Sequence, residues 1–230
     1  MSAAKIIDLS GRRVLVTHAK QFMGPVLCET FAELGATVIA DDQPLIDPAQ
    51  PADVVRAAGR VDVLLVNLSL PAPRSNAVDA TDEEWREVFA HLVDPLPRLV
   101  RAVLPQMIER RAGKILLLGS AAALRGQKRA STYSAARGAQ VAYIQTVGIE
   151  VAQHNVQVNA IAQNFVDNPT YFPAELQANP AFQERLKRDV PLGRLVVPHE
   201  DAMFAAYLCT EAANCFVGQV FPLCGGWVTR

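Results

Sequence analysis

The chain has 230 residues, a formal net charge of −1 and hydrophobic residues at half of its positions. This length fits one α/β domain spanning 1–230, with a well-filled core. The charge is close to zero and no Lys/Arg run occurs, which argues against a nucleic-acid partner. No stretch approaches the roughly 18 continuous apolar residues of a membrane span, and the N-terminus lacks the apolar segment of a signal peptide. We therefore expect a cytoplasmic protein with no membrane association.

Apolar runs of strand length alternate with helical patterns along the chain. Strands are predicted at 13–17, 37–41, 61–67, 114–118, 156–161 and 219–223. Helices are predicted near 24–34, 51–58, 81–110, 132–152 and 199–209. Pro95 and Pro97 should start a new helix or kink a long one, and Gly35 and Gly113 should end helices. The alternation predicts an α/β fold with a single doubly wound parallel sheet, Rossmann-like in type.

Residues 163–198 depart from this alternation, because they contain five prolines and several aromatic residues. The segment follows a predicted strand, so it leaves the carboxyl edge of the sheet, where ligands bind in open α/β folds. We expect it to cover a substrate pocket. The four cysteines and four histidines are scattered without metal-ligand spacing. The sequence therefore predicts small buried thiols and no metal site.

Three residues, Ser120, Tyr133 and Arg137, are the candidate catalytic group. Tyr133 and Arg137 are four positions apart in a helical pattern, so they share one face of the helix. A tyrosine hydroxyl is a poor base at neutral pH because its pKa is about 10, but a fixed cation beside it favours the tyrosinate. Ser120 follows a predicted strand and can hold a substrate hydroxyl. The alternative is a helix start with an exposed arginine and two incidental hydroxyls. The order of strand, Ser, loop and helix favours acid–base chemistry.

Residues 17–24 follow the first strand, where a dinucleotide-binding loop would carry three glycines. Here His18 and Phe22 replace glycines, and only Gly24 remains. Glycines let the backbone approach a pyrophosphate, whereas a phenylalanine projects a ring toward the same space. We therefore expect no nucleotide cofactor. Asp41 and Asp42 support the opposite interpretation, since an acid about 20 residues after such a loop often binds a ribose hydroxyl.

The layout resembles the short-chain dehydrogenase/reductase superfamily over nearly the whole chain. The landmarks are Thr17, Asn67, Ser120, Tyr133 and Gly218 with the pair Gly225-Gly226 near the end. The chain departs from the superfamily at Arg137, where a lysine is usual, at Leu92, about where a structural asparagine lies, and in the lost glycines. These departures resemble the halohydrin dehalogenase branch of the superfamily.

The resemblance implies a cofactor-independent enzyme that converts vicinal halohydrins to epoxides with release of halide, and that opens epoxides with halide or other small anions in reverse. Tyr133 would remove the hydroxyl proton, Arg137 would stabilise the tyrosinate, and Ser120 would orient the hydroxyl. The branch also implies a homotetramer and a halide pocket in place of the nicotinamide.

A halide needs partial positive charge, which backbone N–H groups and aromatic ring edges supply. The predicted halide- and substrate-binding residues combine such amides and rings: Phe22, Gln163, Asn164, Phe165, Val166, Tyr171 and Phe172. The alternative for each ring is an apolar lid packed by aromatic residues. Trp227 is expected to pack the chain end rather than border the pocket.

Two other functions remain open from the sequence. The first is an NAD(P)-dependent oxidoreductase with a degenerate glycine loop, in which Tyr133 is the acid/base and Asp41 or Asp42 binds the ribose. The second is a catalytically silent sensor that kept the fold for ligand binding or assembly. The intact group of Ser120, Tyr133 and Arg137 argues against the silent sensor.

Overall fold

A computed structural model describes residues 7–229 of the chain. The strands of the described part are β1 Arg13–Val16, β2 Thr37–Ala40, β3 Val63–Asn67, β4 Gly113–Ser120, β5 Val156–Gln163 and β6 Val220–Leu223. They form one parallel sheet in the order β2-β1-β3-β4-β5-β6. The predicted α/β fold with a doubly wound parallel sheet is confirmed.

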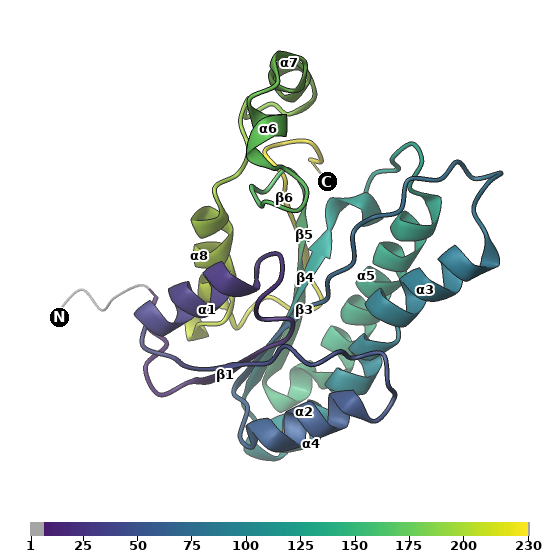
Figure 1. Cartoon of the computed structure of the whole chain (residues 1–230). Coiled ribbons are helices and arrows are strands. Elements are labelled where there is room, and N and C mark those ends of the chain that lie inside the picture. The colour runs from purple at the N-terminus through teal and green to yellow at the C-terminus, as the bar shows by residue number, and fades with distance from the viewer. Residues whose placement is uncertain (1–6, 230) are drawn as a thin grey trace.

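The longer helices of the described part are α1 Gly24–Glu33, α2 Gln50–Ala58, α3 Asp82–Leu92, α4 Pro95–Arg110, α5 Ser131–Val151, α7 Pro180–Asp189 and α8 Pro198–Leu208. A four-residue helix, α6 Ala174–Gln177, and three 3-10 turns, η1 Ala121–Ala123, η2 Ala152–His154 and η3 Glu211–Ala213, complete the elements. Figure 1 shows α2 to α5 on one face of the sheet and α1 with α8 on the other.

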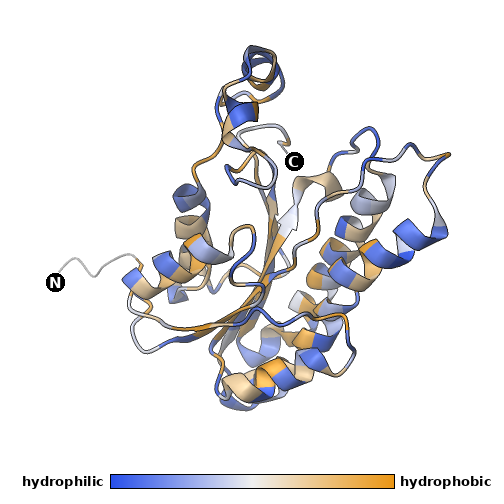
Figure 2. Cartoon of the chain, in the orientation of Figure 1, coloured by the Kyte–Doolittle hydropathy of each residue, from blue (hydrophilic) through white to orange (hydrophobic). Residues whose placement is uncertain are grey.

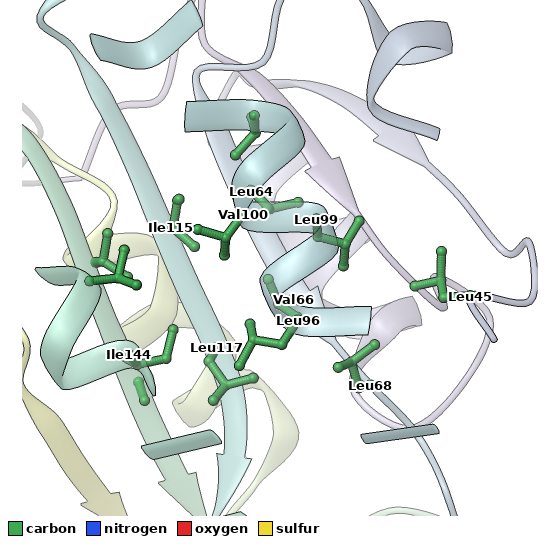
Figure 3. Close-up of a cluster of buried hydrophobic side chains, with 14 of the residues drawn as sticks. Leu45, Leu64, Val66, Leu68, Leu96, Leu99, Val100, Ile115, Leu117 and Ile144 are labelled. Atoms are coloured by element: carbon green, nitrogen blue, oxygen red, sulfur yellow. The ribbon is translucent and has the colours of Figure 1, made fainter. Parts of the chain in front are cut away.

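The central strands are apolar because helices cover both of their faces. Every residue of β3 is buried, and so are seven of the eight residues of β4 and of β5. In Figure 3, side chains of β3, β4, α4 and α5 meet in one cluster on one face of the sheet. Figure 2 shows the hydrophobic strands inside and hydrophilic residues on the outer sides of the helices. Burial of this apolar surface is the main force that holds the helices on the sheet.

The predicted helix 81–110 is two helices, as the prolines suggested. Helix α3 ends at Leu92, and α4 begins at Pro95, whose fixed φ and missing N–H suit a first helical position. Gly35 follows α1 with φ +92, which confirms it as a helix stop.

The prediction that Gly113 ends a helix is wrong. Arg111, with φ 50, takes the left-handed position after α4, and Gly113 is the first residue of β4. A Cβ atom at position 113 would lie 2.4 Å from the Met107 sulfur. Glycine is needed there because α4 packs closely on the start of β4.

The segment 163–198 leaves the carboxyl end of β5 and carries α6 and α7. These two helices were not predicted from the sequence, because the segment is rich in proline. In α7, Pro180 is the first helical residue, and the Asn179 side chain accepts from the Ala181 N–H at 2.9 Å. Figure 1 shows α6 and α7 beyond the carboxyl ends of the strands. The aromatic rings of this segment, including Phe165, Phe172 and Phe182, form a small apolar cluster of its own.

The scattered cysteines are free thiols, but not all are buried as predicted. Cys215 is exposed because it lies in the turn after η3. Across residues 7–229, no group of His, Cys, Asp or Glu side chains could hold a metal ion. None of the helices in the same range is long and apolar enough to cross a membrane.

Candidate active site

A cavity of about 540 Å³ opens at the carboxyl edge of the sheet. It lies beside the ends of β1 and β3, which are neighbours although β2 comes between them in the chain. Ligands bind at such a switch point in open α/β folds. All ten residues predicted as catalytic or halide-binding line this cavity: Phe22, Ser120, Tyr133, Arg137, Gln163, Asn164, Phe165, Val166, Tyr171 and Phe172.

Helix α5 presents Tyr133 and Arg137 on its buried face, one turn apart. The Arg137 guanidinium carbon lies 5.0 Å from the centre of the Tyr133 ring. The guanidinium donates to Gln140 Oε1 at 3.0 Å and to the Leu68 carbonyl at 3.3 Å. Gln140 in turn donates to the Leu92 carbonyl. This chain of hydrogen bonds fixes the guanidinium beside the tyrosine.

Arg137 is a buried cation that has no carboxylate partner within residues 7–229. Its residue exposure is 6%, it forms no ion pair there, and its Nε has no hydrogen-bond acceptor. An unpaired buried charge is unfavourable because it has left water. A negative charge that forms on the adjacent Tyr133 oxygen, or on a ligand, would balance it. The site is therefore arranged to stabilise an anion.

Ser120 ends β4 and begins the 3-10 turn η1. Its hydroxyl oxygen accepts from the Ala122 N–H at 3.2 Å, which sets the side chain at the cavity wall. The hydroxyl proton remains available to a ligand, because the oxygen acts as acceptor in this contact. Ser120 and Tyr133 thus supply two hydroxyl groups to one cavity from different elements.

Tyr171 is the second tyrosine of the cavity, and its hydroxyl is held by the backbone after β3. It donates to the Leu70 carbonyl at 3.1 Å and accepts from the Ala72 N–H at 3.1 Å. Burial, together with the nearby Tyr133, raises the pKa of Tyr171 well above its ordinary value. Tyr171 therefore keeps its proton, and Tyr133 is the candidate proton acceptor.

The loop between β1 and α1 is fastened to the end of β3. The Asn67 side chain donates to the carbonyls of His18 at 3.0 Å and Gln21 at 2.9 Å. His18 is buried, its Nδ1 accepts from the Ser69 N–H at 3.2 Å, and burial lowers the pKa of its imidazole. His18 is therefore neutral and forms part of the loop framework.

The same loop holds two bulky residues in the left-handed backbone region. His18 has φ 44 and Phe22 has φ 47, conformations that glycine adopts without strain. Each costs on the order of 1 to 3 kcal/mol, and such strain gathers at functional sites. The loop has thus kept the backbone path of a glycine turn and gained two side chains.

The fold type implies a dinucleotide, but the residues of this loop do not fit one. The Phe22 ring lies 5.3 Å from the Tyr171 ring, measured between centroids, and lines the cavity. The retained glycine serves packing, since a Cβ at Gly24 would lie 2.4 Å from the Ala19 carbonyl oxygen. Side chains therefore cover the loop backbone that a pyrophosphate would have to contact.

The amides of loop 163–166 are only partly free for an anion. Asn164 N–H donates to the Leu223 carbonyl at 3.1 Å, and Phe165 N–H donates to the Asn164 side chain at 2.9 Å. Phe165, with φ 53, takes a left-handed turn. Val166 N–H has no acceptor among the described residues.

Gln163 is held by a carboxyl group that the sequence did not single out. Its side-chain amide donates to Asp201, in the first turn of α8. Asp201 has no exposed surface, and its second carboxyl oxygen has no hydrogen-bond partner among the described residues. Burial raises the pKa of Asp201 to about 7. The pair fixes the wall of the cavity at the end of β5.

Sequence reasoning missed Gln140 and Asp201 for different reasons. Gln140 lies three residues after Arg137 in one helix, so helical spacing could have placed it on the same face. Asp201 is 38 residues from Gln163, and nothing in its local sequence indicates burial. Trp227, as predicted, packs the chain end: its ring lies 6.1 Å from that of Phe165 and below the Arg125 guanidinium.

Comparison with known proteins gives the family. The family model described as enoyl-(acyl carrier protein) reductase matches residues 4–228. A putative ketoacyl reductase of Streptomyces coelicolor is 32% identical over 185 residues, which are 76% of this chain and 70% of that protein. The chain therefore belongs to this family, within the short-chain dehydrogenase/reductase superfamily.

Solved structures add two neighbours of another kind. A structure described as a dehalogenation enzyme superposes with a TM-score of 0.89 and 30% identity, covering 95% of this chain and 99% of that one. A halohydrin dehalogenase bound to ethyl (2S)-oxiran-2-ylacetate gives a TM-score of 0.87 and 28% identity, covering 95% and 98%. Sequence relatives are thus reductases, and structural neighbours include dehalogenases.

Proposed function

We propose that the protein is a halohydrin dehalogenase that needs no cofactor. The observation that carries this proposal is Arg137, a buried cation beside Tyr133 that has no carboxylate partner among residues 7–229. It lies in a cavity where Phe22 occupies the loop that would carry glycines. The similarity to the dehalogenase structures supports it.

The proposed reaction is an internal displacement. Tyr133, as tyrosinate stabilised by Arg137, takes the proton of the substrate hydroxyl, while Ser120 holds the oxygen. The oxygen forms a bond to the neighbouring carbon as the carbon–halogen bond breaks. The halide leaves with the bonding electron pair toward loop 163–166, and the organic product is an epoxide. In reverse, a small anion opens the epoxide and Tyr133 returns the proton.

The second candidate is an NAD(P)-dependent oxidoreductase, which the reductase relatives favour. Asp41 or Asp42, directly after β2, is the group that would bind a ribose hydroxyl in that case. Burial raises the pKa of the Asp41 carboxyl.

One experiment separates the two candidates. Purified protein is given a vicinal bromohydrin without nucleotide, and bromide release is followed. We expect turnover, and we expect calorimetric titration with NADH or NADPH to show no binding between about 1 μM and 1 mM, the usual range for enzyme ligands. No bromide release, together with micromolar nucleotide binding and hydride transfer to a carbonyl, would establish the reductase instead.

A second prediction concerns the halide site. Bromide should inhibit ring closure competitively with the halohydrin, because the leaving atom and free bromide occupy the same place. Phe22→Ala should weaken that inhibition on the order of tenfold, about 1.4 kcal/mol, by widening and wetting the pocket. The measurement is the bromide inhibition constant of both proteins. Trp85→Ala, on the exposed surface of α3, is the control and should leave the constant unaltered. Inhibition that is identical in Phe22→Ala and wild type would make Phe22 a packing residue.

A further inference from the structure

The mouth of the cavity carries cations from three separate segments. Arg74 lies in the loop after β3, Lys128 and Arg129 lie in the loop before α5, and Arg185 lies on α7. Together with Arg137, five basic residues of the described part line the cavity, and no aspartate or glutamate of that part does so. The whole chain has 22 basic and 23 acidic residues, so this is a local excess of positive charge.

These cations are largely unpaired. Arg74, Lys128 and Arg129 form no ion pair within residues 7–229. Arg129 donates to the Arg74 carbonyl at 2.8 Å, which ties the two loops together at the rim. Within residues 7–229 the one ion pair of Arg185 is a 3.9 Å contact with Asp189, a carboxylate that Arg188 approaches to 2.9 Å, and its guanidinium carbon lies 5.8 Å from the centre of the Phe182 ring. The basic side chains at the rim are therefore available to a ligand.

An acidic group close to the loops before α3 and α5 is occupied by other hydrogen bonds. Glu84, on α3, accepts hydrogen bonds from Ser75 at 2.8 Å and Thr132 at 2.5 Å. It does not line the cavity. In Figure 1 the loops before α3 and α5 lie on one side of the sheet edge and α6 and α7 on the other, and Figure 2 colours much of the loop before α5 as hydrophilic. Charges of one sign around a cleft focus the potential inside it.

We propose that the organic substrate is itself an anion: a vicinal halohydrin, or its epoxide, that carries a carboxylate or phosphate group held by the rim cations. This deepens the proposed function and rests on it. A cavity of about 540 Å³ has the size of pockets for drug-sized ligands, so a reacting centre near Tyr133 leaves room for a chain toward the rim. Guanidinium groups bind carboxylates and phosphates with paired hydrogen bonds, which suits Arg74 and Arg129.

The test compares a carboxylate substrate with its neutral amide, and adds a phosphate counterpart. Bromide release is measured for 4-bromo-3-hydroxybutanoate and for its neutral amide, with 3-bromo-2-hydroxypropyl phosphate as the phosphate counterpart. We expect at least one of the two anions to exceed the amide in kcat/KM by at least about tenfold, and we expect the ratio to fall at high salt. Which anion is preferred distinguishes carboxylate from phosphate.

Charge-removal variants assign the preference to the rim. In an Arg74→Gln, Lys128→Gln double variant, kcat/KM for the anion divided by kcat/KM for the amide should fall toward one. The control is Lys187→Gln, which lies on α7 but outside the cavity and should keep the wild-type ratio. This inference is wrong if the amide reacts as fast as both anions, or if the double variant keeps the wild-type ratio of kcat/KM values. Either result leaves the proposed dehalogenase function unaffected. If no compound releases bromide, the proposed function itself fails.

Discussion

Replacement of Tyr133 by phenylalanine should abolish halide release, with a loss of at least about 100-fold in kcat, the lower end of what a general base contributes. The variant deletes the hydroxyl and keeps the ring, which packs in the core beside Arg137. Tyr171 cannot take over, because its hydroxyl is bound to Leu70 and Ala72 and its pKa is raised.

The measurement is initial bromide release by both proteins, with the far-ultraviolet circular dichroism spectrum as a check of folding. Tyr143→Phe is the matched control, because Tyr143 lies on the same helix and outside the cavity. It should retain wild-type turnover. Near wild-type turnover in Tyr133→Phe would contradict the mechanism, since no other group has been assigned as proton acceptor.

Replacement of Asp201 by asparagine should change the pH dependence of stability. The pKa of Asp201 rises from 3.8 to about 7 on folding, so the folded state binds this proton more tightly than the unfolded state. Asp201 therefore costs no stability below about pH 4, where it is protonated in both states, and its destabilisation grows between about pH 4 and pH 7 and levels off above pH 7. Each pKa unit corresponds to about 1.4 kcal/mol, so the loss of stability approaches about 4 kcal/mol at pH 8.

The asparagine variant keeps an oxygen that can accept from Gln163 but cannot ionise. Its amide nitrogen would replace the unpaired carboxyl oxygen, at a cost of about 1 to 3 kcal/mol for a buried donor without a partner. We expect the variant to be less stable than wild type at pH 4 and equal or more stable at pH 8, as measured by urea unfolding. All other residues are the same in both proteins, so the difference in pH dependence reports on position 201. Parallel stability curves from pH 4 to 8 would rule out a raised pKa at this site.

The sequence determined the fold because the signal for each element is local. Apolar runs of strand length predicted all six strands, several of them continuous, and β3 to β5 are buried on both faces. The meeting of Ser120, Tyr133 and Arg137 in one cavity also follows from local order. In a parallel α/β sheet the carboxyl ends of the strands lie at one edge, so a residue that ends β4 lies near the first turns of the helix that follows, α5.

Gly113 and the helices of 163–198 show where local signals fail. A glycine after a helix is often its stop, yet here an arginine takes the left-handed position and the glycine allows Met107 to approach. The prolines of 163–198 suggested that helices would be absent. Helix α7 forms nevertheless, because Pro180 is its first residue, a position where proline is favourable.

Only the tertiary structure decided the electrostatics of the site. Within residues 7–229 no carboxylate lies beside Arg137, which local sequence does not show. The Gln163–Asp201 pair and the anchoring of Tyr171 by the loop after β3 join residues tens of positions apart. The basic rim likewise gathers side chains from three segments with no common motif. Burial and charge pairing depend on which distant segments pack together, and a linear pattern of residue types does not contain that information.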